Sequence, residues 1–291
     1  NQKAQVILLD VCLKALPNIL TKKCLATDVI FPNSSMVLVE GVYKNNAIAD
    51  QFNNILGETI VAYIQQRIHN NPKAKLKLLE IGAGTGGTTE GLLPKLIPFQ
   101  DNIDQYLYTD VSKAFLMHAQ DKYVKDYPYV MPHFFDVTKP LLEQGIKPDN
   151  YDIVIATNVL HATPNIRETL QNAKATLHRS GIIIINELSN QSWFAHLTFG
   201  LLEGWWLSQD QALRISGSPG LYPETWERVL KEEGFENIIF PAKALHHLGQ
   251  QLIVAESNGL IKECTNLFLE TPITSSISNS KDVITNKEIP Y

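Results

Sequence analysis

A glycine-rich loop between an apolar run and a helical segment constrains the fold of this chain more than any other feature. The run from Leu78 to Gly87 reads Leu-Leu-Glu-Ile-Gly-Ala-Gly-Thr-Gly-Gly, and a helical pattern continues to Leu96. Glycine lets the backbone turn tightly and approach a ligand where a Cβ atom would clash. We therefore expect a strand, a ligand-binding loop and a helix in that order, as in α/β nucleotide-binding folds.

Two carboxylates indicate which ligand the loop binds. Glu80 precedes the first glycine, where an anionic pyrophosphate would be repelled, and Asp110 ends the next apolar run. A carboxylate in the position of Asp110 is suited to both ribose hydroxyls of an adenosine. An adenosine without phosphates indicates S-adenosylmethionine, which carries a sulfonium and an amino acid. A dinucleotide is the alternative, because dehydrogenases and flavoproteins use similar glycine loops.

The chain divides into three parts by its residue patterns. Residues 1–72 have apolar residues at helical spacing over 6–20 and 49–69, and we predict a helical lid. Residues 73–257 alternate apolar runs with helical patterns, which predicts βαβ units and a parallel sheet in a ligand-binding core. Residues 258–291 lose this rhythm and predict a linker-like tail.

Seven apolar runs predict seven strands in the core. The last two runs are separated by only nine residues, which is short for a right-handed parallel crossover, so we expect the last strand to be antiparallel. A Rossmann-like α/β sheet of seven strands with the last one reversed is the architecture associated with class I methyltransferases. The expected strands are 76–81, 105–109, 130–135, 151–156, 181–186, 236–240 and 250–256, and the expected helices are 88–97, 112–123, 165–178 and 222–233.

Composition argues against several classes of protein. A net charge of −5 is unlike the basic balance of a nucleic-acid binder. Cys12, Cys24 and Cys264 have no metal-type spacing, which indicates free thiols in a reducing, cytoplasmic compartment. No apolar run reaches the ~18–20 residues that span a bilayer, so no membrane association is expected. The chain begins at Asn1 rather than Met, which indicates a piece of a larger protein.

Polar residues follow several of the predicted strands at their carboxyl ends, where open α/β sheets bind ligands. Asp136 follows the third strand and is placed to reach an adenine amino group; the alternative is a turn or cap for Val137 and Thr138. The residues predicted to contact the cofactor are Glu80, Gly82, Ala83, Gly84, Gly86, Asp110, Asp136, Asn158 and, from the lid, Tyr43.

His161 is the sharpest candidate for a catalytic base. It follows the fourth predicted strand on the loop that leads into the next helix. Histidine titrates near neutral pH and is suited to taking a proton from an acceptor. Glu187 ends the fifth strand on the same rim, where a carboxylate would orient the imidazole ring and stabilise it once protonated. The alternative is that Glu187 caps the following segment.

An aromatic stretch after the fifth strand predicts a wall over the acceptor. The segment from Trp193 to Trp206 is too aromatic for an exposed loop; ordinary helix-on-sheet packing is the alternative. No metal site is expected, because the pair His246–His247 has no matching carboxylates. The predicted substrate-pocket residues are Phe199, Leu202, Trp205, Trp206 and Trp226.

Four segments together resemble the methyltransferase domains embedded in modular polyketide synthases of bacterial type and in hybrid peptide synthetases. The glycine loop is common to many methyltransferases, but its combination with the other three segments is much more specific. The resemblance runs from about Val11 to Ser257. The segments are Glu80-Ile-Gly-Ala-Gly-Thr-Gly-Gly87, Asn158-Val-Leu-His-Ala162, Asn186-Glu187 and Phe199-Gly-Leu-Leu-Glu-Gly-Trp-Trp206.

The resemblance implies S-adenosylmethionine as donor, S-adenosylhomocysteine as product, and His161 with Glu187 as a dyad that acts as general base. It also implies an acyl chain on the phosphopantetheine arm of an acyl carrier protein as acceptor, with neighbouring synthase domains as partners. Members methylate either a β-hydroxyl or enol oxygen, or the α-carbon of a β-ketoacyl thioester. Because carbon-methylating members tend to have larger lids than about 72 residues, O-methylation is favoured.

Two functions of other classes are the alternatives. One is a non-catalytic scaffold domain, against which the intact glycines, Asp110, His161 and Glu187 all argue. The other is a nicotinamide oxidoreductase such as a ketoreductase. No Tyr-x-x-x-Lys pair follows the fifth strand, and Glu80 is badly placed for a pyrophosphate, so this alternative is disfavoured.

Overall fold

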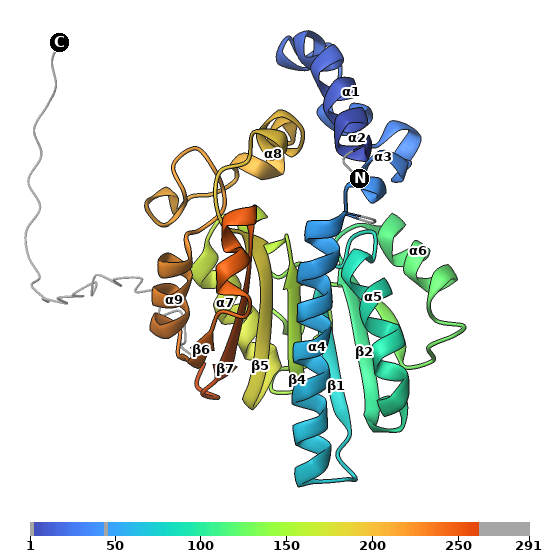
Figure 1. Cartoon of the computed structure of the whole chain (residues 1–291), viewed down its shortest axis with the longest axis vertical. Helices are drawn as coiled ribbons and strands as arrows, with labels where there is room; N and C mark the ends of the chain where they lie inside the picture. The colour runs from blue at the N-terminus through green and yellow to red at the C-terminus, as the bar shows by residue number, and fades with distance from the viewer. Residues whose placement is uncertain (1–2, 44–45, 262–291) are drawn as a thin grey trace, which may run out of the picture.

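A mixed seven-stranded sheet lies at the centre of the computed structural model, which describes residues 3–43 and 46–261 (Figure 1). The strands are β1 Leu76–Ile81, β2 Ile103–Asp110, β3 Val130–Phe134, β4 Tyr151–Thr157, β5 Leu177–Leu188, β6 Phe235–Ile239 and β7 Gln250–Ser257. They lie in the order β3-β2-β1-β4-β5-β7-β6, and β7 is antiparallel to both β5 and β6. The predicted Rossmann-like sheet with a reversed last strand is therefore confirmed.

Strand order reverses at the centre of the sheet, because β1 pairs with β2 on one side and with β4 on the other. A crevice opens beyond the carboxyl ends of β1 and β4 at such a point. The residues that follow β1, β2, β4 and β5 meet at this edge. These are the strand ends at which the sequence places most of its candidate site residues.

Helices cover both faces of the sheet. Figure 1 shows α4 and α5 in front of the strands. Phe52, Leu56, Ile60 and Ile64 of α4 are fully buried, and their four-residue spacing puts them on the side of the helix that faces the sheet. The helices of this face are α4 Ala47–Asn70, α5 Gly87–Leu96 and α6 Lys113–Lys122; those of the other face are α7 Ile166–Thr176 and α9 Pro223–Glu232.

A small helical lid lies above the carboxyl ends of the strands (Figure 1). It consists of α1 Lys3–Leu20, α2 Ala26–Ile30 and α3 Val37–Tyr43. A separate apolar cluster that includes Leu8, Cys12 and Ile30 packs the lid against side chains of segment 194–202. This segment, which includes most of α8 Trp193–Leu197, is part of the predicted aromatic wall.

Most predicted element boundaries shift by one or two residues, and two differences from the predictions are larger. Helix α4 lies inside the predicted lid of residues 1–72 but packs on the sheet, so the division of the chain at residue 72 stays a prediction. Strand β5 begins at Leu177, which pairs with Tyr151 of β4, and α7 therefore ends before the predicted limit. Most of the predicted tail, from residue 262 onward and with Cys264, lies outside the described residues. Over the described ranges, no helix is both long and apolar enough to cross a membrane.

Candidate active site

The glycine loop joins β1 to α5 with backbone angles that favour glycine. Gly82, Gly84 and Gly86 have φ angles of +59°, +60° and +77°. A Cβ atom on Gly82 would lie 2.3 Å from Cγ2 of Val159. A Cβ atom on Gly84 would meet only the carbonyl oxygen of Gly82, at 3.9 Å. Gly84 therefore borders open space, and a bound molecule can approach its backbone closely.

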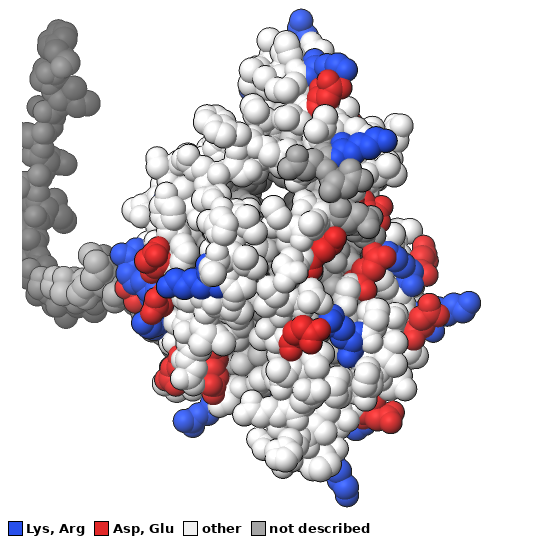
Figure 2. Space-filling model, viewed as in Figure 1, with Lys and Arg blue, Asp and Glu red and all other residues white. Residues whose placement is uncertain are grey.

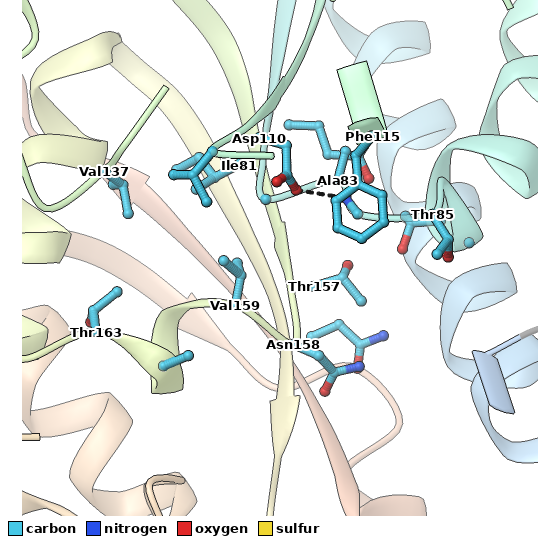
Figure 3. A pocket seen from close by; sticks show the side chains of 18 of the residues that line it. Ile81, Ala83, Thr85, Asp110, Phe115, Val137, Thr157, Asn158, Val159 and Thr163 are labelled. Atoms are coloured by element: carbon cyan, nitrogen blue, oxygen red, sulfur yellow. Dashed lines mark hydrogen bonds between the residues drawn. The ribbon is translucent and has the colours of Figure 1, made fainter. Parts of the chain in front are cut away.

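Asp110 holds the glycine loop from the end of β2. Its Oδ2 accepts a hydrogen bond from the N–H of Gly84 at 2.9 Å, drawn dashed in Figure 3, and its Oδ1 accepts one from Ser112 N–H at 2.8 Å. Burial raises the pKa of Asp110, although these N–H groups act in the opposite direction. Each carboxylate oxygen accepts more than one hydrogen bond, so Asp110 is able to hold the loop and bind ribose hydroxyls together.

Glu80 forms buried hydrogen bonds with the elements that flank the glycine loop. Its Oε2 accepts hydrogen bonds from Thr89 Oγ1 at 2.5 Å and from the hydroxyl of Tyr106 at 2.7 Å. Burial raises the pKa of this carboxyl. The side chain thus ties β1 to β2 and α5. Glu80 also borders the adjacent cavity, and its predicted contact with the cofactor stays a prediction.

A cavity of about 530 Å³, here called the first cavity, lies between the glycine loop and the lid. Figure 3 shows Asp110 and Phe115 at one side of it and Asn158 below them. Phe115, Phe135 and Val137 give it apolar walls, which suit a flat adenine ring. Predicted cofactor residues that line it are Glu80, Gly82, Ala83, Gly84, Asp110, Asp136 and Asn158.

Three predicted cofactor residues differ from the rest in their contacts or in what the structure describes of them. Asp136 Oδ1 accepts hydrogen bonds from the N–H and the hydroxyl of Thr138, at 3.0 and 2.6 Å. Asp136 therefore stabilises a turn, which was the alternative to a cofactor contact, and it also lines the cavity. Gly86 does not line the cavity; it is the N-cap of α5, and the absence of a Cβ atom makes room for Tyr123. The side chain of Tyr43 lies outside the part of the structure that is described.

The polar groups of the first cavity fit S-adenosylmethionine. Thr157 Oγ1, Asn186 Oδ1 and Gln250 Oε1 are buried, and none has a hydrogen-bond partner in the described part of the chain. These acceptors match the N–H groups of the ammonium of S-adenosylmethionine, and the Asp110 carboxylate matches the hydroxyls of its ribose. Gly84 leaves space for the ligand to approach the backbone closely. Among the described residues there is no group of three or more His, Cys, Asp or Glu side chains that could hold a metal ion.

His161 and Glu187 form a buried pair beside this cavity. Strand β4 pairs with β5, and this pairing brings the loop after β4 next to the end of β5. The Nδ1 atom of His161 lies 2.7 Å from Oε2 of Glu187. The side chains of His161 and Glu187 are 9% and 1% exposed. The structure therefore brings together the two residues that the sequence places on one rim.

Hydrogen bonds fix the protonation of this pair. Oε1 of Glu187 accepts from the backbone N–H groups of Val159 and His161, at 3.0 and 3.2 Å. Burial acts to raise the pKa of Glu187, but the adjacent His161 and these hydrogen bonds outweigh it and hold the pKa below its usual value. An ionised carboxylate only accepts hydrogen bonds, so Nδ1 of His161 carries the hydrogen of this contact, and Nε2 is the ring nitrogen that has the lone pair in a neutral imidazole.

A second cavity, of about 510 Å³, adjoins the first and is lined by His161. Figure 2 shows a hollow between the lid and the core whose surroundings carry few acidic or basic side chains. The ring of Trp205 lies 5.6 Å from that of His161. The base candidate therefore faces a compartment next to the glycine loop. Residues common to both cavities are Ala49, Asn158, Ala162, Phe199 and Gln250.

Three of the five predicted pocket residues, Phe199, Leu202 and Trp205, line the second cavity. The other two line neither of these cavities. Trp206 is 58% exposed, and its Nε1 donates to the carbonyl of Gly200 at 2.8 Å. Trp226 is fully buried in the core between α9 and the sheet. The large aromatic side chain of Trp226 fills the core rather than the pocket, a distinction that residue type alone does not reveal.

Sequence reasoning missed several residues that border the site. Gln250 begins β7 and lines both cavities, because the antiparallel strand returns to the ligand edge of the sheet. Arg214 is 9% exposed and donates to the carbonyl of His161 at 3.1 Å. No local pattern marks its contact with the site, since Arg214 lies in an irregular segment and His161 is 53 residues away in sequence.

Comparisons with known sequences identify relatives of the chain. A methyltransferase-domain family model matches residues 79–183. Polyketide synthase PksR of Bacillus subtilis (strain 168) is 57% identical over 263 residues, which are 90% of this chain and 10% of that protein. Polyketide synthase PksM of the same organism is 50% identical over 280 residues, which are 96% of this chain and 7% of that protein. The chain thus spans a tenth or less of these relatives.

Solved structures also resemble the chain. The DszA carbon methyltransferase matches with a TM-score of 0.84 and 36% identity, covering 90% of this chain and 67% of that one. The CurJ carbon methyltransferase matches with a TM-score of 0.80 and 33% identity, covering 88% and 67%. The trans-methyltransferase CalH, solved in complex with SAH, matches with a TM-score of 0.65 and 29% identity, covering 84% and 65%.

Proposed function

The chain belongs to the S-adenosylmethionine-dependent methyltransferase domains of polyketide synthases, and we propose that it methylates the α-carbon of a β-ketoacyl thioester. The observation that carries this proposal is the His161–Glu187 pair, of which His161 lines a cavity directly adjoining the cavity of the glycine loop. A base and a donor site in adjoining compartments suit proton removal coupled to methyl transfer.

Carbon is favoured over oxygen as the methylated atom by the structural relatives. The DszA and CurJ proteins, which are 36% and 33% identical to this chain, are carbon methyltransferases. The preference for O-methylation rested on the short predicted lid. Because α4 packs on the sheet, the lid helices α1–α3 are shorter still than residues 1–72, so lid length by itself continues to favour oxygen. We give more weight to the carbon chemistry of the DszA and CurJ proteins than to this argument from length.

The residues of the dyad account for the proton. His161 Nε2 takes the proton from the α-carbon, and the electron pair of that C–H bond becomes an enolate shared with the neighbouring carbonyls. Glu187 stabilises the resulting imidazolium through Nδ1. Bound S-adenosylmethionine supplies an electrophilic methyl group for the carbon nucleophile.

The second cavity suits a neutral, tethered acyl chain. Among the described residues, no Asp, Glu, Lys or Arg lines it. Apolar side chains such as Phe194, Leu202 and Leu248 line it together with the amides of Asn190 and Gln191. This combination matches the thioester, alkyl and amide groups of an acyl phosphopantetheine arm, and we infer that an acyl carrier protein delivers the acceptor.

A mass-spectrometric assay tests this proposal. The domain is incubated with S-adenosylmethionine and either β-ketoacyl or β-hydroxyacyl pantetheine thioesters, and fragmentation locates the added methyl group. We expect one methyl group on the α-carbon of the β-ketoacyl chain only. A methyl group on oxygen would support the O-methylation alternative. No product from either panel, with S-adenosylmethionine bound, would support the scaffold alternative.

His161→Ala provides the residue-level test. We expect this variant to bind S-adenosylmethionine normally and to lose α-methylation, because the base is absent while the first cavity is intact. His178→Ala is the matched control, since His178 also lies beside a carboxylate, Asp149, but its side chain is 42% exposed and lines neither cavity. Wild-type turnover by His161→Ala would remove His161 as the base.

A further inference from the structure

Arg214 is a buried arginine whose five N–H groups all have acceptors. Its Nε and Nη2 atoms donate to the carboxylate of Asp210, at 2.6 and 3.1 Å. Nη1 donates to the carbonyls of His161 and Pro219, at 3.1 and 2.9 Å, and Nη2 also donates to the carbonyl of Thr163 at 3.0 Å. A guanidinium has five N–H donors in a fixed plane, so no other side chain can make this set of bonds.

Asp210 extends the contact to the start of α7. Its Oδ2 accepts a hydrogen bond from the N–H of Ile166 at 2.7 Å. The preceding residue, Gln209, donates its N–H to the carbonyl of Pro164 at 2.8 Å. Residues 209–214 therefore run along the segment 161–166 and form hydrogen bonds with four of its residues, at positions 161, 163, 164 and 166. The pair of Asp210 and Arg214 joins two segments that are about fifty residues apart in sequence.

The segment that carries His161 has little support of its own. It is a single 3-10 turn, Leu160–Ala162, and it follows Asn158, whose φ angle is +50°. Short 3-10 turns have poor internal hydrogen-bond geometry, so their position depends on outside contacts. Glu187 holds the ring and the N–H of His161, and Arg214 holds its carbonyl from the other side.

We propose that Arg214, held by Asp210, is a positioning residue that sets the place of the His161 base against the acceptor. The inference rests on the proposed α-carbon methylation. Arg214 lines neither of the two adjoining cavities and acts only through the backbone of the His161 segment. Loss of the guanidinium releases the carbonyls of His161 and Thr163 together, so the ring of His161 loses its fixed distance to the α-carbon.

Hydrogen–deuterium exchange at the α-carbon measures this positioning directly. The protein is saturated with S-adenosylhomocysteine in deuterium oxide, a β-ketoacyl pantetheine thioester is added, and enzyme-dependent exchange above the uncatalysed rate is followed. S-adenosylhomocysteine has no methyl group to transfer, so exchange reports proton removal alone. Because the donor site is saturated, a change in donor affinity does not affect the exchange rate. We expect Arg214→Met to lower the exchange rate by about 100-fold, the scale of a misplacement of about 1 Å at a reacting group. Arg214→Lys retains the positive charge but not the planar set of five N–H donors, so its exchange rate should lie between those of wild type and Arg214→Met.

Arg228→Met is the matched control, because Arg228 is an exposed arginine of α9 away from both cavities. Melting temperatures are measured for all variants. Exchange lost in folded Arg214 variants, with the KM for the acceptor little changed, supports the proposal. Wild-type exchange in folded Arg214→Met overturns it, and so does a failure of both Arg214 variants to fold, which would assign Arg214 to stability alone. If the unmodified protein itself shows no exchange, the proposed function fails instead.

Discussion

Replacing Gly84 by alanine should damage donor binding far more than it damages the fold. The new Cβ atom would meet no atom of the chain closer than 3.9 Å, so the loop has no steric reason to move. A left-handed backbone costs an L-residue about 1–2 kcal/mol, which in a domain of this size lowers the melting temperature by roughly 2–8 °C. The protein should therefore remain folded at ordinary assay temperatures.

The same methyl group enters the first cavity, which Gly84 lines. One added methyl group in a close-packed site costs about 1–3 kcal/mol, so affinity for S-adenosylhomocysteine should fall by about 5- to 150-fold. Isothermal titration calorimetry measures the affinity, and thermal unfolding with and without S-adenosylhomocysteine measures the stability. The ligand-induced rise in melting temperature should shrink in the variant.

Gly91→Ala is the matched control for this experiment. Gly91 lies in α5, and a Cβ atom there would meet nothing within 4 Å. Alanine in a helix is more stable than glycine by about 0.5–1 kcal/mol, so this variant should melt slightly higher and bind as the wild type does. Wild-type affinity in Gly84→Ala would refute the assignment of the glycine loop as the donor cradle.

Three further substitutions test the carboxylates. Asp110→Asn should weaken S-adenosylhomocysteine binding by about 1–3 kcal/mol in calorimetry through lost charged hydrogen bonds, and unchanged affinity would remove Asp110 from the ribose site. The pKa of Glu187 is lowered in the folded state, so its ionised form stabilises the protein above pH ~4.3. Wild type should therefore melt at a higher temperature than Glu187→Gln above this pH, and the difference in melting temperature should shrink as pH falls below it. A difference that stays constant with pH would contradict the reasoning. Burial raises the pKa of Glu80, so wild type should lose stability relative to Glu80→Gln as pH rises above ~4.3 and through that raised pKa. Melting temperatures of the two proteins that stay parallel as pH rises would contradict the reasoning.

The fold was predictable because its signals are local. The glycine loop after Ile81 and the run Ile182–Ile185 each identify a buried strand of a parallel sheet, and the short connection before Gln250 indicates the reversed strand. The placement of His161 beside Glu187 followed from the same logic, since neighbouring strands bring their carboxyl ends to one edge.

The remaining features depend on contacts that no local pattern encodes. Trp206 and Trp226 are aromatic residues of the expected kind, yet one faces solvent and the other fills the core. The division at residue 72 could not reveal that α4 packs on the sheet, because an amphipathic helix shows that it has an apolar side but not which layer covers it. Arg214 reaches His161 and Thr163 through their carbonyl groups, which every residue possesses, so these two contacts leave no mark in the sequence.

The alternation of side chains along β5 limits how synthase genes can be recombined. Asn186 lines the first cavity, while the next residue, Glu187, holds His161, so inserting or deleting one residue within β5 would exchange their faces. The four identical side chains of Ile182–Ile185 cannot themselves define a register. Gly181 helps to define it, because a Cβ atom there would lie 3.1 Å from the carbonyl oxygen of Asp152 on β4. Crossover points between related domains should therefore lie outside 181–187, where a mismatch in length would separate the His161–Glu187 pair from the first cavity.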